Sequence, residues 1–195
     1  MTRIVHEKAD VIPMVAEVFR ELGFEGASMS KITARTRLSK GSLYYFFPGG
    51  KDEMATEILA HIDQWFISHI FEPLERDEPR AAIEHMWREV DAYFQSGGRI
   101  CLVGAFALDE TRDRFSAMIR QYFERWIQAL GTAIVRTGVS AEAASKLAEE
   151  VVSGIQGSLL LSRALHDKSV FERRLAGLKE RGSDFIQLTS RHELT

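Results

Sequence analysis

The chain has 195 residues, of which 45% are hydrophobic and 27% charged, and its formal net charge is −3. A globular chain of this size can bury one sizeable core, or form a small domain docked on a larger one. Its longest nearly apolar run, 100–108, is too short to span a membrane. The single cysteine, Cys101, excludes an intrachain disulfide, and no Cys/His cluster has the spacing of a zinc site. The first residues lack the apolar stretch of a secretory signal, so we expect a cytoplasmic protein without metal or other cofactor.

Apolar residues recur every three to four positions along the chain, and this periodicity predicts an all-α fold. Near the N-terminus it predicts three helices, over 7–22, 29–36 and 40–47. Pro13 favours a regular start of the first helix near residue 12, and Gly23 is expected to end that helix. Ser28 and Ser39 precede the second and third helices, where their hydroxyls can cap free backbone N–H groups.

Longer amphipathic helices are predicted for the rest of the chain. The first extends over 51–70 and is expected to stop before Pro73, which cannot continue a regular helix. Further helices are predicted over 79–94, 112–137, 141–166 and 170–188, with a short helix or turn at 100–108. Ser140 is the expected N-cap of the helix at 141–166.

The charges of the chain are unevenly distributed. The segment 26–51 has no acidic residue and five basic ones, which are Lys31, Arg35, Arg37, Lys40 and Lys51, although the chain as a whole is acidic. Clustered cations favour phosphate binding, because each phosphate contact releases counterions locally. A solvated charged surface is the alternative that this pattern leaves open.

Two short helices joined by a three-residue turn, 37–39, are typical of a helix-turn-helix, whose second helix enters the major groove of DNA. Helices this short need support from the first helix. The stretch resembles the signature of the TetR family, through Ser28, Ile32, the run LSKGSLYYFF at 38–47 and Lys51. The FPGGK connection at 47–51 and the segment GGRICLVGAFALDE are most similar to the LmrA/YxaF-like branch of that family.

The resemblance implies a helix-turn-helix DNA-binding domain over 1–51 and an effector-binding and dimerisation domain over 52–195. It implies a transcriptional regulator, most commonly a repressor, that binds a palindromic double-stranded DNA operator as a homodimer. A small hydrophobic or aromatic effector would release it. Carried over by position, the residues at the DNA are Ser28, Arg37, Ser39, Lys40, Gly41, Ser42, Tyr44, Tyr45 and Lys51. Leu43 and Phe47 are expected to face the core, and a half-buried aromatic ring is the alternative for Tyr45.

Two positions depart from the family pattern. Thr36 and Arg37 stand where the family usually has a small residue followed by glycine, so a left-handed backbone at Arg37 would cost on the order of 1 kcal/mol. Phe46 replaces a common histidine, which removes one polar contact.

A ligand pocket is expected among the central helices, and its candidate lining is mostly apolar or aromatic. The candidates are Trp65, Phe66, Met86, Val90, Phe94, Cys101, Phe106, Tyr122 and Trp126. A stripe of small and apolar residues predicts close helix packing at a dimer interface, with intrachain core as the alternative. These candidates are Leu130, Ile134, Val151, Gly154, Ile155, Ser158, Leu159 and Ser162.

Cys101 also raises two other functions. No histidine or acid stands in a motif that would activate its thiol, so we expect no enzyme. A thiol redox-sensing regulator of the same fold is the alternative function.

Overall fold

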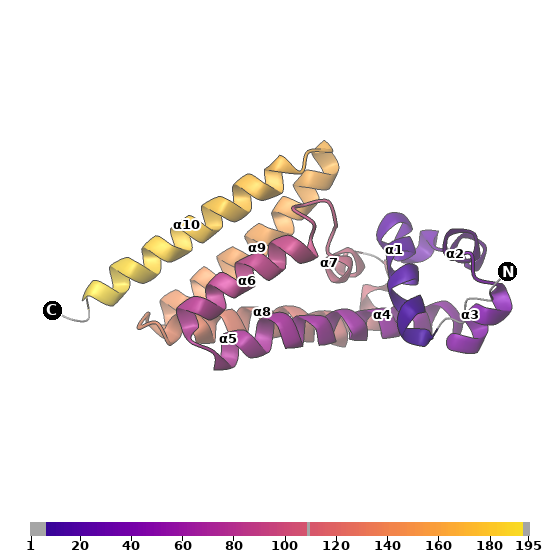
Figure 1. Cartoon of the computed structure of the whole chain (residues 1–195), viewed down its shortest axis with the longest axis horizontal. Coiled ribbons are helices and arrows are strands. Elements are labelled where there is room, and N and C mark those ends of the chain that lie inside the picture. The colour runs from indigo at the N-terminus through magenta and orange to yellow at the C-terminus, as the bar shows by residue number, and fades with distance from the viewer. Residues whose placement is uncertain (1–6, 109, 193–195) are drawn as a thin grey trace. The chain divides into compact units, whose positions relative to one another are not determined.

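In the computed structural model, which describes residues 7–108 and 110–192, helix follows helix and none of the described residues forms a strand (Figure 1). The all-α fold expected from the sequence is confirmed. Packing divides the chain into two compact units. Unit 1 comprises 1–64 and 102–119, and unit 2 comprises 65–101 and 120–195. The functional division at Lys51 stays a prediction, while the packing boundary lies further along the same helix.

Unit 1 contains the three N-terminal helices. Its elements are α1 (Lys8–Gly26), α2 (Met29–Thr36), α3 (Lys40–Phe46), most of α4 (Gly50–Phe66), α7 (Leu102–Ala107) and the 3₁₀ helix η2 (Glu110–Phe115). The expected late start of α1 is wrong. Glu7 and Asp10 form a capping box that satisfies the first turn, so the helix begins at Lys8 and continues through Pro13. Gly23 breaks the regular helix as predicted, with φ 70° and ψ 172°, and one further turn follows.

The core of unit 1 is built around Phe24, in the last turn of α1. Its ring centroid lies 5.8 Å from those of Phe19 and Phe106 and 5.7 Å from that of Phe115. All four rings are buried. Such offset and edge-on ring contacts add to the free energy gained by burying the rings. Two chain segments far apart in sequence therefore share one core, while α2 packs against α1 and α3 against α2.

The helix predicted over 51–70 does not stop before Pro73. α4 passes into the π-helix η1 (Ile67–Phe71) and then into α5 (Glu72–Arg76). The backbone N–H of Glu72 donates to the carbonyl of Ile67, five residues earlier, which is the π-helical step. Pro73 then lies in the first turn of α5, directly after the π-helical step.

Unit 2 contains the remaining long helices, which are α6 (Pro79–Tyr93), most of α8 (Ser116–Val135), α9 (Ala141–Leu165) and α10 (Ser169–His192). Ser140 caps α9 as predicted, and α8 starts later than predicted because η2 occupies the residues before it. α9 and α10 form a hairpin and lie side by side (Figure 1). A Cβ atom added at Gly154 of α9 would lie 2.9 Å from Leu178 Cδ1 of α10, so this glycine allows the close approach.

Candidate DNA interface and effector region

The helix-turn-helix is held by its two serine caps. The Ser28 hydroxyl accepts a hydrogen bond from the backbone N–H of Lys31 at 3.4 Å. The Ser39 hydroxyl accepts one from the backbone N–H of Ser42 at 3.0 Å, and the hydroxyl oxygens of Ser39 and Ser42 lie 2.8 Å apart. Both predicted caps are confirmed, and they fix where α2 and α3 begin.

The turn keeps its shape despite the departure at Thr36 and Arg37. Arg37 adopts the left-handed conformation, with φ 60° and ψ 16°, at the strain cost expected for a non-glycine residue. The buried Thr36 hydroxyl donates to the carbonyl of Ile32 at 2.7 Å and accepts from the N–H of Leu38 at 3.3 Å. This side chain therefore ties the end of α2 to the turn through two local hydrogen bonds.

α3 has one buried and one exposed face. Leu43 and the following Phe47 are fully buried, as predicted. Lys40, Gly41, Tyr44 and Tyr45 are exposed and Ser42 is half-buried. Tyr45 is 80% exposed, so the structure does not place it as a half-buried aromatic ring. The polar and aromatic side chains of α3 are therefore available to the groove of a duplex.

Lys51 is engaged within unit 1. Its ammonium donates to the carbonyl of Phe24 at 3.0 Å, lies 3.6 Å from a carboxylate oxygen of Glu25 and sits 4.2 Å from the centroid of the Phe24 ring. Arg35 similarly forms an ion pair with Glu21 of α1. Neither acidic partner was predicted from the sequence. The four-residue spacing of Glu21 and Glu25 near the end of α1 was the available signal in the sequence. Their basic partners, however, lie in other helices.

The effector candidates are mostly buried, and they do not form one group. Phe106 belongs to the core of unit 1, whereas the others belong to unit 2. In unit 2 the ring of Phe66 lies 4.9 Å from that of Tyr122 and 5.1 Å from that of Trp126. Cys101 is 6% exposed and Trp65 is half-buried. Met86, Val90 and Phe94 are fully buried.

Trp126 has an unusual polar environment. The side chain is fully buried, and among the described residues its indole N–H has no hydrogen-bond partner. A buried donor without an acceptor costs roughly 1–3 kcal/mol. An acceptor brought by a bound molecule would remove that cost.

The dimer candidates pack inside the chain. Except for the half-buried Gly154, which faces Leu178, they are all buried, and the small-residue stripe therefore forms intrachain core. Other residues of the hairpin are exposed. On α9 these are Leu160, Leu161 and Leu165, and on α10 they are Phe185 and Leu188.

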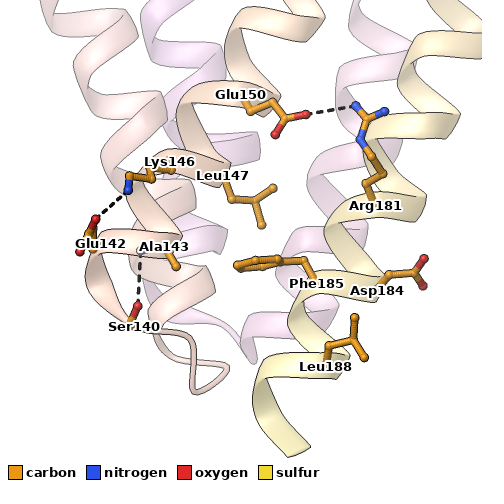
Figure 2. Close-up of a pocket in the computed structure, with 10 residues that line it drawn as sticks. All are labelled: Ser140, Glu142, Ala143, Lys146, Leu147, Glu150, Arg181, Asp184, Phe185 and Leu188. Atoms are coloured by element: carbon orange, nitrogen blue, oxygen red, sulfur yellow. Dashed lines mark hydrogen bonds and ion pairs between the residues drawn. The ribbon is translucent and has the colours of Figure 1, made fainter. Parts of the chain in front are cut away.

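A groove of about 640 Å³ runs between the first turns of α9 and the last turns of α10. Figure 2 shows Leu147 and Phe185 pointing toward one another across it, with Leu188 below. An ion pair of 3.2 Å between Glu150 and Arg181 closes one end. The groove adds an apolar, partly charged surface to the exposed side of the hairpin.

No helix within 7–108 or 110–192 is both long enough and apolar enough to cross a membrane. Over the same residues, no group of three or more His, Cys, Asp or Glu side chains could hold a metal ion.

Two family models match the chain. The model described as bacterial regulatory proteins, tetR family, matches residues 16–58, and the transcriptional regulator LmrA/YxaF-like C-terminal domain matches residues 79–175. The chain belongs to the TetR family. This TetR-family transcriptional regulator carries its DNA-binding helix-turn-helix in unit 1, where the first model matches α1 to α4.

Individual proteins agree with the family assignment. The uncharacterized HTH-type transcriptional regulator YxaF of Bacillus subtilis is 23% identical to this TetR-family regulator over 87% of its chain and 91% of the relative. A TetR transcriptional regulator from Legionella pneumophila has the same fold, with a TM-score of 0.78, 18% identity and coverage of 92% and 99% of the two chains. The fold of a CifR cysteine mutant, solved with 26-bp double-strand operator DNA, matches with a TM-score of 0.70 and 22% identity over 93% and 97%.

Proposed function

We propose that this regulator is a homodimeric repressor that binds a palindromic operator in the cytoplasm and leaves it when a small hydrophobic or aromatic effector binds unit 2. The observation that carries the proposal is the exposed face of α3. Lys40, Tyr44 and Tyr45 project from a helix whose other side is fixed by buried Leu43 and Phe47. A helix held in this way can present side chains to base edges without losing its own packing.

The exposed residues have distinct proposed roles. Lys40 and Ser42 contact base edges, and Gly41 allows the backbone to approach the groove floor. Ser28, Arg37, Ser39 and Lys51 contact phosphates, and Tyr44 and Tyr45 contact either backbone or bases. The CifR mutant was solved on operator DNA, which supports a similar docking of this fold.

For the dimer, we assign the contact to the exposed apolar side chains of α9 and α10. Leu160, Leu161 and Leu165 are 51–62% exposed, which is unusual for neighbouring leucines on one helix. A two-fold interface buries the same surface of both chains, so one glutamate substitution acts twice. Leu165→Glu is expected to shift the protein from dimer to monomer in analytical ultracentrifugation. Leu108→Glu, at a still more exposed leucine of unit 1, is the control and should remain dimeric.

The effector site is assigned to the aromatic residues around Trp126. Phe66, Tyr122 and Trp126 offer ring surfaces, and the indole N–H offers one donor without a partner. This chemistry suits a flat, apolar molecule with a hydrogen-bond acceptor. Compounds that release DNA should lose potency against Trp126→Phe and retain it against Trp87→Phe, since Trp87 is a buried tryptophan outside this cluster.

Release follows from the spacing of the recognition helices. A dimer reading adjacent major-groove faces needs its two α3 helices about 34 Å apart. The effector acts by binding more tightly to a dimer with another spacing, and DNA must then weaken effector binding by the same factor. The proposal assigns the chain no catalysis. Burial of Cys101 favours an effector-responsive regulator over the thiol redox sensor.

The deciding experiment is fluorescence anisotropy on the duplex upstream of the regulator's own gene, titrated across salt. Selective, salt-sensitive binding that Lys40→Ala and Tyr44→Ala abolish supports the proposal. Lys146→Ala removes an exposed lysine of α9 and is the charge-matched control. If binding is no tighter than to random duplex, and selection from random DNA also yields no site, the proposed operator binding is wrong.

A further inference from the structure

Two acidic residues of α1 pair with cations of the basic segment 26–51. Arg35 pairs with Glu21, and Lys51 pairs with Glu25 at 3.6 Å. Both carboxylates come from the end of α1, on either side of the break at Gly23. Two of the five cations in the segment 26–51 are therefore matched by acidic groups from outside that segment.

The other cations of the segment are not matched in this way. Among the described residues no ion pair holds Lys31, Arg37 or Lys40. Lys40 instead lies 5.9 Å from the centroid of the Tyr44 ring, on the exposed face of α3. The segment 26–51 thus contains three cations open to phosphate and two that a phosphate can reach only by displacing a carboxylate.

These acidic contacts are weak enough to be exchanged. The side chains of Glu21, Glu25 and Arg35 are 51–66% exposed, and that of Lys51 is 24% exposed with its ammonium 3.6 Å from Glu25. Ion pairs at such exposure contribute little free energy, because water and salt screen them. A well-placed phosphate can replace the carboxylate, whereas a loosely placed one meets a competitor.

We propose that Glu21 and Glu25 are specificity-determining residues, which compete with phosphate for Arg35 and Lys51 and so hold down sequence-independent DNA binding. Non-specific affinity is almost wholly electrostatic, whereas operator affinity includes base contacts made by α3. An operator complex fixes the phosphates and can displace the carboxylates, but random DNA leaves them paired. The inference rests on the proposed DNA interface and adds the residues that limit it.

This selectivity has a physical purpose. A regulator must find its operator among a very large number of competing sites, so the ratio of specific to non-specific affinity matters more than affinity alone. If fewer cationic side chains of the protein contact random DNA, the ratio of specific to non-specific affinity rises without any new base contact.

The test measures binding to a random-sequence duplex across salt for Glu21→Gln, Glu25→Gln and Glu17→Gln. Glu17 is the matched control, because it lies on the same helix, has similar exposure and loses the same charge, but its ion pair is with Arg20 of α1. Glu21→Gln and Glu25→Gln are each expected to bind about two- to fivefold more tightly at low salt than Glu17→Gln. The log–log salt slope should steepen by about 0.9 for each phosphate gained.

A double-substitution cycle adds an independent readout. Arg35→Gln should weaken random-duplex binding only slightly in the natural sequence, and clearly more when Glu21→Gln is also present. Equal behaviour of all three glutamine variants, or an unchanged effect of Arg35→Gln in the cycle, overturns the proposal. If the unaltered protein binds no duplex at low salt, the proposed DNA interface is itself wrong, and the carboxylates have no bound phosphate to compete with.

Discussion

The left-handed residue at the turn of the helix-turn-helix allows stability and DNA binding to be separated in one substitution. Arg37 has φ 60° and ψ 16° and is exposed. Arg37→Gly removes both the strained side chain and the charge. We therefore expect a protein that is more stable but binds DNA less tightly.

The magnitude follows from two opposing effects. Releasing a non-glycine residue from the left-handed region returns roughly 1–2 kcal/mol. The extra freedom of glycine in the unfolded chain costs about 0.4–1 kcal/mol. The net gain in the free energy of unfolding is about 0–1.6 kcal/mol. Its central value of about 0.8 kcal/mol corresponds to a melting temperature about 2 °C higher for a chain of this length.

Thermal melting and salt-dependent anisotropy measure the two effects. If Arg37 contacts one phosphate per protomer, the log–log salt slope should fall by about 0.9 per protomer in Arg37→Gly. Arg37→Lys is a control that keeps both charge and strain, and Arg37→Asn tolerates the left-handed backbone without charge. A lower melting temperature in Arg37→Gly refutes the strain argument. An unchanged salt slope in both Gly and Asn variants removes Arg37 from the interface.

Three further predictions concern other backbone and cap positions. Gly97→Ala should lower the free energy of unfolding by about 3 kcal/mol in chemical denaturation, because φ is 87° and the new Cβ would lie 2.5 Å from Phe171 Cβ. Gly157→Ala is the control and should not destabilise the protein, since its new Cβ meets nothing within 4 Å. Equal stability of the two variants contradicts this account. Ser39→Ala should lower the free energy of unfolding by about 1 kcal/mol, because it removes the N-cap of α3, and Ser39→Thr should restore most of that loss. An unchanged melting temperature in Ser39→Ala argues against the cap. Backbone N–H groups in the first turn of α6 lower the pKa of the Glu78 carboxyl, so its contribution to stability is present above its ordinary pKa near 4.5 and is lost as pH falls through the lower folded value. Glu78→Gln should therefore flatten the profile of unfolding free energy against pH in that acid range. If the two profiles superimpose, the cap contributes nothing to stability.

Local signals predicted the helix-turn-helix well. Ser28 and Ser39 act within their own first turns, and Gly23 acts through its own backbone, so neighbouring residues contain the necessary information. The buried face of α3 also follows from spacing alone, since Leu43 and Phe47 are one turn apart. What could be predicted was therefore the part of the site whose geometry is decided over a few residues.

Features that depend on distant partners were not predictable in the same way. Apolar periodicity, for example, gives no sign of the π-helical step before Pro73. The small-residue stripe with Gly154 fits either a partner chain or Leu178 of the same chain, and only the folded hairpin decides between them. Lys51 has the position of a phosphate contact in the sequence, but Glu25 competes for it across the fold.

The order in which unit 1 is synthesised sets when it can fold. Phe19 and Phe24 are made early, but Phe106 and Phe115, which complete their core, are made only after the first segment of unit 2, 65–101. During translation the aromatic side chains of the DNA-binding helices therefore stay uncovered until the segment with Phe106 and Phe115 has been made. Chimeric regulators that join these N-terminal helices to another effector domain will for the same reason need to bring the segment 102–119 with them, or replace the rings that it supplies.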